Sequence, residues 1–234
     1  SDMRRGKATA NAAFGNAASV LVGDFIYTRS FQMMTELGSM KILKLMSDAV
    51  NIIAEGEVQQ LMNCNDPDTT EDSYMQVIYS KTAKLFEAAT ELAAIITEQD
   101  DDIINALKYY GMHLGTAFQL VDDVLDYSAN QAELGKSIGD DLAEGKPTLP
   151  LIIAMKNGSK EQSELIRGAI ENADGKEYLE KVLSILDETN ALALTMAKAQ
   201  EEAEKAISYL SDIPNSEYKE ALIALAKLSV DRTY

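Results

Sequence analysis

Gly115-Thr-Ala-Phe-Gln-Leu-Val-Asp-Asp-Val-Leu-Asp-Tyr127 is an apolar segment that carries three carboxylates, on Asp122, Asp123 and Asp126. In a helix over residues 103–127, Asp122 and Asp126 share one face, and Asp123 lies about a quarter turn away. Like charges at this spacing destabilise an isolated helix by roughly 0.2–0.5 kcal/mol, and a divalent cation removes the repulsion. The segment therefore predicts a metal-binding helix face. The alternative is a solvated acidic face, since the whole chain is rich in acids.

A polar loop follows this helix and adds charges of both signs. Asp141 comes fifteen residues after Asp126, within Gly135-Lys-Ser-Ile-Gly-Asp-Asp-Leu-Ala-Glu-Gly-Lys146. This loop also contributes Lys136 and Lys146. Carboxylates hold Mg²⁺, and Mg²⁺ and lysines together hold phosphate groups. The pairing of helix and loop predicts a site for Mg²⁺ and a diphosphate.

Composition excludes several classes of protein. The 234 residues include 21 Lys and Arg against 38 Asp and Glu, a net charge of −17. Such a surface repels nucleic acid and anionic membranes. A single cysteine, Cys64, forms no internal disulfide and is typical of a reducing compartment, so we expect a cytoplasmic protein. The longest apolar runs are too short for an integral membrane segment.

The hydrophobic pattern predicts an all-α fold in one domain, residues 1–234. Apolar residues recur at helical spacing and no β-period segment of convincing length occurs. There is no linker and no internal repeat. The chain is long enough for one substantial core. The predicted helices span residues 11–35, 39–63, 71–97, about 101–127, and 147–155, with three or four more in 160–232 and a loop at 128–146.

These motifs together resemble the trans-isoprenyl (polyprenyl) diphosphate synthase family, in particular its long-chain bacterial members of the octaprenyl type. The family's second aspartate-rich motif, G-x-x-F-Q-x-x-D-D-x-x-D, is followed by G-K-x-x-G-x-D-L-x-x-G-K-x-T-L-P. Both parts are present here, as Gly115–Asp126 and Gly135–Pro150. Further blocks match in order, namely Arg4-Arg5-Gly6 with Thr9, Val22-Gly-Asp-Phe25, Glu55-Gly-Glu57 with Gln60, and Tyr79-Ser-Lys-Thr82. The likeness covers essentially the whole chain.

The family's first aspartate-rich motif and an isopentenyl-binding block precede the part that resembles residues 1–9. Neither occurs in this sequence. We therefore expect a chain that is incomplete at its N-terminus. The N-terminal helices of an isoprenoid-synthase-type bundle around a central cavity would then be missing, and this form would have little activity.

The resemblance implies a Mg²⁺-dependent enzyme that condenses isopentenyl diphosphate with an allylic diphosphate. The product would be a long-chain all-trans polyprenyl diphosphate, a precursor of quinone side chains. A homodimer is implied as well. Asp122, Asp123, Asp126 and Asp141 would hold Mg²⁺ directly, through water or from an outer shell.

The same resemblance assigns the substrate contacts. Lys81, Lys136 and Lys146 would contact diphosphate oxygens as point charges. Arginines bind phosphate bidentately, and Arg4 would take the allylic diphosphate and Arg5 the isopentenyl one. Polar contacts near the allylic carbon fall to Thr82 and Gln119.

A long product needs an apolar channel. Tyr27, Phe31 and Met34 form a helical stripe, and Met46 lies on the next helix. We expect Phe31, Met34 or Met46 to close the channel, although plain helix–helix core explains the same pattern. Rival functions are a terpene cyclase of the same fold, a non-catalytic subunit of a heteromeric prenyl synthase, and a metal-binding scaffold.

Overall fold

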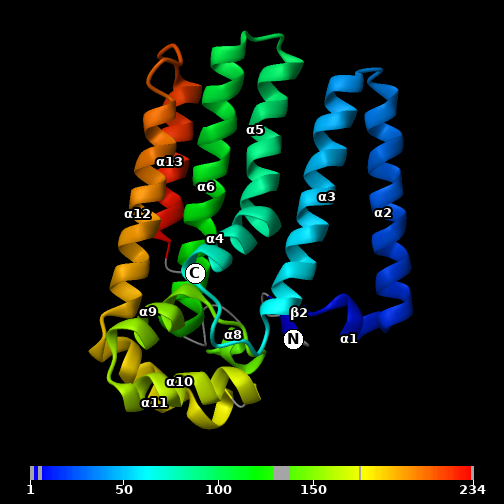
Figure 1. The fold of residues 1–234 in the computed structure, drawn as a ribbon. Coiled ribbons are helices and arrows are strands. Elements are labelled where there is room, and N and C mark those ends of the chain that lie inside the picture. The colour runs from blue at the N-terminus through cyan, green and yellow to red at the C-terminus, as the bar shows by residue number, and fades with distance from the viewer. Residues whose placement is uncertain (1–2, 5–6, 129–137, 174, 233–234) are drawn as a thin grey trace.

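The structure is a computed structural model, and it describes residues 3–4, 7–128, 138–173 and 175–232. Figure 1 shows long helices standing side by side on a layer of shorter helices. The prediction of an all-α fold is confirmed, since the strands β1 (Met3–Arg4) and β2 (Lys7–Ala8) form only a two-residue antiparallel pair. The helices are α1 (Ala10–Phe14), α2 (Asn16–Glu36), α3 (Met40–Asn63), α4 (Glu71–Ile78), η1 (Tyr79–Ala83), α5 (Lys84–Ile96), α6 (Asp101–Ser128), α8 (Asp140–Ala143), α9 (Leu149–Asn157), α10 (Lys160–Asn172), α11 (Gly175–Glu188), α12 (Ala191–Tyr209) and α13 (Glu217–Asp231).

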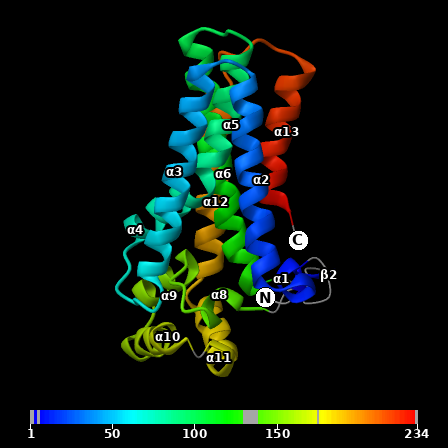
Figure 2. The same ribbon diagram turned by 90° about the vertical axis from the view of Figure 1, so that its right-hand side faces the viewer.

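Helix α6 runs through the middle of the molecule and carries the aspartates (Figure 2). It begins where the Asp100 carboxylate accepts a hydrogen bond from the backbone N–H of Ile103, at 2.9 Å. Helix α5 packs along one side of α6 and α12 along another. Leu120 and Val121 are fully buried. These apolar residues, directly before the aspartates, anchor the helix in the core, and their packing fixes the direction in which each carboxylate points.

Small residues on α6 let α5 and the preceding η1 approach it closely. A Cβ atom at Gly111 would lie 2.5 Å from the carbonyl oxygen of Phe86, and one at Gly115 would lie 2.6 Å from the Cα atom of Ala83. Larger side chains at these two positions would force the helices apart. Gly115, the first residue of the aspartate-rich segment, thus has a packing role.

The predicted helix over residues 11–35 is divided into two helices, α1 and α2, whereas the predicted helix over residues 39–63 is observed as α3. Gly15 has φ of 80° and separates α1 from α2, because a residue in this conformation cannot continue a helix. Gly38, with φ of 68°, turns the chain into α3, and the Ser39 hydroxyl caps α3 by accepting from the N–H of Ile42. No residue of α2 is buried. Helix α3, in contrast, buries Ile42, Ala49 and Gly56.

The shorter helices α8 to α11 gather below the long ones (Figure 1). Their apolar faces meet the lower parts of α4, α6 and α12 in one core, which includes Leu142, Leu151, Ile166 and Leu186. Pro150 lies in the first turn of α9, where a missing N–H costs no hydrogen bond. The predicted loop at 128–146 contains α8 in its described part. No helix that the structure describes is both long and apolar enough to cross a bilayer.

The predicted helix over residues 71–97 is interrupted. Its middle, η1, is a π-helix of five residues between α4 and α5. Hydrophobic periodicity did not reveal this insertion, because one extra residue in a turn leaves the apolar pattern on either side intact. The interruption falls on Lys81 and Thr82, two of the predicted site residues.

Candidate functional site

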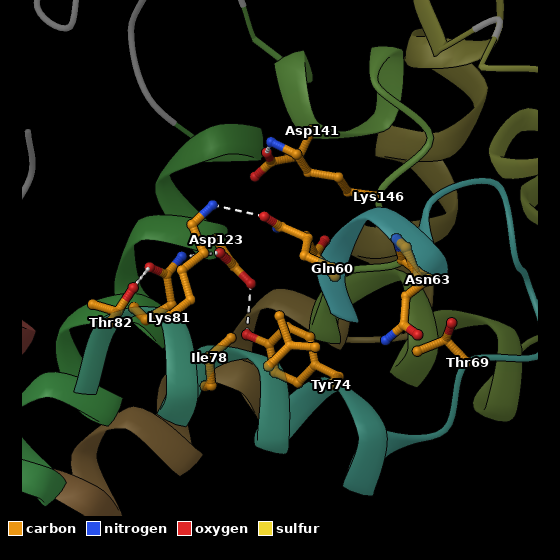
Figure 3. A pocket seen from close by; sticks show the side chains of 14 residues that line it. Gln60, Asn63, Thr69, Tyr74, Ile78, Lys81, Thr82, Asp123, Asp141 and Lys146 are labelled. Carbon is orange, nitrogen blue, oxygen red and sulfur yellow. Dashed lines mark hydrogen bonds and ion pairs between the residues drawn. The ribbon is translucent and has the colours of Figure 1, made fainter. Parts of the chain in front are cut away.

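A pocket opens among α3, α4 with η1, α6 and the chain segment that follows α8. Figure 3 shows the side chains that line it, with Tyr74, Lys81, Thr82 and Asp123 gathered around its centre. Its lining consists of Gln60, Asn63, Thr69, Tyr74, Val77, Ile78, Lys81, Thr82, Gln119, Asp123, Asp141, Lys146, Pro147 and Thr148. Six of the predicted site residues thus meet in one pocket: Lys81, Thr82, Gln119, Asp123, Asp141 and Lys146.

A chain of hydrogen bonds crosses the floor of this pocket. The Thr82 hydroxyl donates to the side-chain oxygen of Gln119 at 3.1 Å. The Gln119 amide donates in turn to Oδ1 of Asp123 at 2.8 Å, and the Tyr74 hydroxyl donates to Oδ2 at 2.6 Å. The network links α4, η1 and α6. It fixes the Gln119 amide so that its orientation is dictated by the carboxylate and the hydroxyl on either side.

Asp123 faces the interior, unlike its neighbour Asp122. Its side chain is buried, with only 2% of the residue exposed. Burial raises the pKa of Asp123 to about 8, and the nearby charges of Asp141 and Asp122 act in the same direction. Hydrogen bonds from Tyr74 and Gln119 oppose the shift, because they favour the ionised form. Asp123 therefore holds the pocket network in place, and its two oxygens are already taken by donors.

Lys81 projects from η1 toward α3. Its ammonium donates to the side-chain oxygen of Gln60 at 2.6 Å and lies 3.5 Å from Glu57 (Figure 3). One third of the Lys81 side chain is exposed, so the ammonium remains accessible from the pocket. The Lys81 side chain thus reaches one wall of the pocket, while that of Thr82, the next residue, reaches the wall formed by α6.

Hydrogen bonds to Asp126 hold Gly139 and Asp141, which follow α6 in the chain, beside the end of that helix. The backbone N–H of Gly139 donates to the Asp126 carbonyl at 2.8 Å, and the N–H of Asp141 donates to the Asp126 carboxylate at 3.2 Å. Gly139 has φ of 75°, a conformation that favours glycine. Fifteen residues apart in sequence, Asp126 and Asp141 are therefore direct neighbours.

Lys146 brings a second ammonium to the pocket. It lies 2.9 Å from the Asp141 carboxylate and 2.6 Å from that of Glu144. Partial burial opposes its charge, but attraction to the carboxylates of Asp141 and Glu144 outweighs this and raises the pKa of Lys146. The same contact lowers the pKa of Glu144. Lys146 is therefore a stable cation beside the acidic helix face.

Asp122 lies on the exposed side of α6, outside the pocket lining. Its carboxylate is 2.9 Å from the guanidinium of Arg232, which sits 3.8 Å above the Phe118 ring centre. Arg232 was not found by sequence analysis. It belongs to no recognisable motif and lies far along the chain from Asp122, so only the packing of α13 against α6 brings the two together. Tyr74 was also missed, although it lies seven residues before Lys81, on a helical repeat.

The acidic residues fit Mg²⁺ bound together with a phosphate ligand rather than a closed metal cage. Within the described part of the chain, no three Asp, Glu, His or Cys side chains are grouped closely enough to hold a metal ion. Mg²⁺ usually takes one or two carboxylates and fills its remaining positions with water and substrate phosphates. Asp122, with 44% of its side chain exposed, and Asp126, one turn later on α6, match that donor set.

Other predicted residues stand apart from the pocket or outside the described structure. Arg5 and Lys136 lie outside the described residues, and Arg4 is described only through its backbone, in β1. The three predicted channel residues, Phe31, Met34 and Met46, are half-buried. Phe31 and Met34 lie toward the C-terminal end of α2 and Met46 toward the N-terminal end of α3, whereas the pocket is lined from the C-terminal end of α3 by Gln60 and Asn63.

Comparison with known proteins identifies the family. Residues 1–186 match the family model of the polyprenyl synthetases. Over 234 residues the chain is 62% identical to octaprenyl diphosphate synthase of Haemophilus influenzae, covering all of this chain and 71% of that protein. It is 60% identical over 232 residues to octaprenyl diphosphate synthase of Escherichia coli, covering 99% of this chain and 72% of that protein.

A solved structure shares the fold. The polyprenyl synthase of Caulobacter crescentus, crystallised with calcium and isoprenyl diphosphate, superimposes with a TM-score of 0.95 at 40% identity. The match covers all of this chain and 72% of that one. A divalent cation and an isoprenyl diphosphate therefore occur together in that relative.

Asp123→Asn should make stability less dependent on pH. Since the pKa of Asp123 is about 8 in the folded protein and about 3.9 in an unfolded chain, the folded state retains a proton that the unfolded state releases between these values. Raising the pH from 5 to 7.5 should therefore lower the stability of the parent through this group, by at most about 1.4 kcal/mol per pH unit. The variant should lose this part of the slope in thermal unfolding curves.

Asp122→Asn is the matched control, because its carboxylate is partly exposed and pairs with Arg232. It should retain the slope that Asp123→Asn removes. Equal slopes in the parent and in Asp123→Asn would show that the buried carboxyl does not titrate in this range.

Proposed function

Because the chain belongs to the polyprenyl synthetase family, we propose that it condenses isopentenyl diphosphate with an allylic diphosphate to a long-chain all-trans polyprenyl diphosphate. The observation that carries the proposal is the convergence of Lys81 and Lys146 on one pocket with Asp123 and Asp141. Cations bind diphosphate oxygens, and an acidic helix face beside them suits a divalent ion. The pocket therefore combines the charges that one substrate class requires.

The chain's own residues would bind and orient the allylic diphosphate. Lys81 and Lys146 would contact its oxygens from two sides, and each has an accessible ammonium. By the family pattern, Arg4 grips the same group, while Arg5 takes isopentenyl diphosphate and Lys136 adds a further cation. Fixed cations of this kind stabilise the charge that develops on the leaving diphosphate.

Thr82 and Gln119 would lie next to the reacting carbon. The allylic C–O bond breaks and its electron pair leaves with the diphosphate. The double bond of isopentenyl diphosphate then forms the new C–C bond, and transfer of a proton to the departed diphosphate creates the trans double bond. The network through Asp123 holds the Gln119 carbonyl and the Thr82 hydroxyl in fixed positions, where their dipoles can face the cation without reorganising.

We propose Mg²⁺ as the cofactor, held by Asp122 and Asp126, with Asp141 as a further or outer ligand and Asp123 as a support from the interior. When bound, the ion would neutralise charge on the diphosphate. Arg232 already pairs with Asp122, which is evidence that this carboxylate accepts a cation from the solvent side.

A growing prenyl chain would extend along the helices away from the pocket. Met46 lies fourteen residues before Gln60 on α3, a rise of roughly 21 Å. Phe31 and Met34 lie near the far end of α2. We therefore propose that Phe31, Met34 or Met46 limits product length.

We also propose a homodimer, formed through α2. This helix has no buried residue and exposes Val20, Leu21, Phe25 and Ile26 to at least 62%. Contiguous apolar patches of this kind mark interaction surfaces. A second copy of the chain would present the same apolar helix and cover it symmetrically. Location in the cytoplasm is proposed on the unpaired thiol of Cys64.

The competing function is a terpene cyclase, which needs only one diphosphate. Incubation with radiolabelled isopentenyl diphosphate and farnesyl diphosphate, followed by dephosphorylation and chromatography, distinguishes the two. A synthase incorporates the label into long prenyl alcohols. Release of an unlabelled hydrocarbon from farnesyl diphosphate alone would favour the cyclase, and absence of both activities in the full-length protein would favour a non-catalytic subunit.

Asp122→Ala in the full-length protein should lower the rate of condensation at least about a hundredfold, or about 2.7 kcal/mol in the barrier, because it removes an exposed carboxylate proposed to hold Mg²⁺. Melting should change little, since the side chain is 44% exposed. Calorimetry should show weaker Mg²⁺-dependent binding of pyrophosphate. The control is Asp102→Ala, an exposed carboxylate in the first turn of the same helix. A rate within about threefold of the parent would contradict the assignment of Asp122.

Met34→Ala should shift products to longer chains without abolishing catalysis, because it removes a steric stop. Each further methylene buried in the channel gains about 0.8 kcal/mol. Met33→Ala is the matched control, since the neighbouring Met33 is 57% exposed. If Met34 is ordinary core, its truncation should instead lower stability by about 2–5 kcal/mol with an unchanged product profile. Unchanged profiles for alanine variants of Phe31, Met34 and Met46 would exclude the stop.

Phe25→Glu should convert the protein from a dimer to a monomer, because it places a charge in the proposed apolar contact. Sedimentation equilibrium measures the mass directly. Leu228→Glu provides a control on α13, where Leu228 is 62% exposed. A parent that sediments as a monomer, or a Phe25→Glu dimer as tight as the parent, would rule out the α2 interface.

A further inference from the structure

The π-helix η1 forms part of the pocket wall. Its five residues, Tyr79–Ala83, include Lys81 and Thr82. A π-turn contains one more residue than an α-turn and is stable only where its surroundings compensate, and such turns are frequent at functional sites. The contacts around η1 therefore indicate what keeps the extra residue in place.

Two glycines on neighbouring helices make room for η1. A Cβ atom at Gly56 of α3 would lie 2.7 Å from Cβ of Ser80 and 2.9 Å from the backbone nitrogen of Lys81. At Gly115 of α6, it would lie 2.6 Å from Cα of Ala83. Helices α3 and α6 thus press on η1 from two directions. Because η1 lies so close to both helices, its side chains can form hydrogen bonds with each of them.

A hydrogen bond spans the π-turn from end to end. The Tyr79 hydroxyl donates to Oε2 of Glu87 at 2.8 Å, from the first residue of η1 to the first turn of α5. In a continuous α-helix, residues eight apart are rotated by about 80°, so they lie on different faces. One inserted residue takes back about 100° and returns the pair to within about 20° of the same face. The Tyr79–Glu87 bond therefore matches the π register and not the α register.

Glu87 is fixed independently of Tyr79. Its side chain is 1% exposed, and its Oε1 atom is 2.6 Å from the ammonium of Lys84 and 3.9 Å from that of Lys108. A buried carboxylate requires such partners. Burial, followed by the hydrogen bond to Glu87, raises the pKa of Tyr79, so its hydroxyl stays protonated and remains a donor. Glu87 is thus a rigid anchor for Tyr79.

We propose that Tyr79 and Glu87 are positioning residues that hold η1 in the π conformation, so that Lys81 and Thr82 reach opposite walls of the pocket. Lys81 meets Gln60 on α3, and Thr82 meets Gln119 on α6. Relaxation of η1 to an α-turn would rotate the following residues by about 100° relative to α4. Thr82 would then leave Gln119, and the network to Asp123 would open. The kinetic part of this proposal rests on the proposed function.

The test compares Tyr79→Phe with the parent, because this change removes only the hydroxyl. Hydrogen exchange should be faster in the amides of residues 80–84, by about fivefold or more, as the π-turn opens more often. This readout needs no enzymatic activity. The ratio kcat/KM for farnesyl diphosphate should fall about tenfold, with a melting temperature close to that of the parent. Tyr218→Phe, on the exposed surface of α13, is the control.

Two further variants separate positioning from general stability. Thr82→Val removes the hydroxyl through which Tyr79 is proposed to act, so adding Tyr79→Phe should cause little extra loss of kcat/KM. Glu87→Gln keeps an oxygen that accepts from Tyr79 but breaks the ion pair with Lys84, so it should lower the melting temperature while exchange in residues 80–84 rises less than in Tyr79→Phe. The proposal would be overturned if the two losses of kcat/KM multiplied in the double variant. It would also be overturned if amide hydrogen exchange in Tyr79→Phe equalled that of the parent. A full-length parent without transferase activity would refute the proposed function, while the exchange arm would still decide the role of Tyr79.

Discussion

The polar end of this molecule depends on one buried carboxylate, that of Asp123. A carboxyl group taken out of water destabilises the fold unless hydrogen-bond partners surround it, and here Tyr74 and Gln119 supply them. Each donor comes from a different direction, so the carboxylate ties α4 to α6. Gln119 also accepts from Thr82, which extends the constraint to η1. Satisfying this single group therefore sets the relative positions of the residues that form the pocket floor.

The two ends of the long helices differ in how tightly they are packed. At the polar end, glycines bring backbones together, and side chains from α3, η1 and α6 meet within hydrogen-bonding distance. At the other end, α2 and α3 are joined by a turn at Gly38, and α2 buries none of its residues. Rigid geometry is thus confined to the region that must recognise charge. The exposed apolar residues of α2 suit hydrophobic contacts, whose strength depends on the area buried rather than on exact geometry.

Much of this arrangement could be predicted from the sequence, because the helices have strong apolar periodicity and clear ends. The segment over residues 103–127 became α6, and its three carboxylates were correctly placed on one stretch of helix. Their division between interior and exterior could not be predicted. Asp122 and Asp123 are adjacent, and only the packing of α4 decides that Asp123 turns inward.

The π-turn and Arg232 were missed for the same physical reason. An inserted residue leaves the periodicity of α4 and α5 unchanged on each side, so the sequence carries no local signal for it. Arg232 meets Asp122 across more than one hundred residues of chain, through the docking of α13. Both features arise from contacts between helices, whereas a single sequence reports reliably on patterns within them.

Two of the described ion pairs differ in burial, and the difference has consequences for binding. Glu87 is almost wholly buried with Lys84, so breaking that pair would strand a charge away from water. Lys81 pairs instead with Glu57, whose side chain is about half exposed. Pairs of this kind contribute little stability, typically about 0–1 kcal/mol. The Lys81 ammonium can therefore exchange its partner for an incoming diphosphate at little cost, while the buried pair at Glu87 keeps the neighbouring helix unchanged.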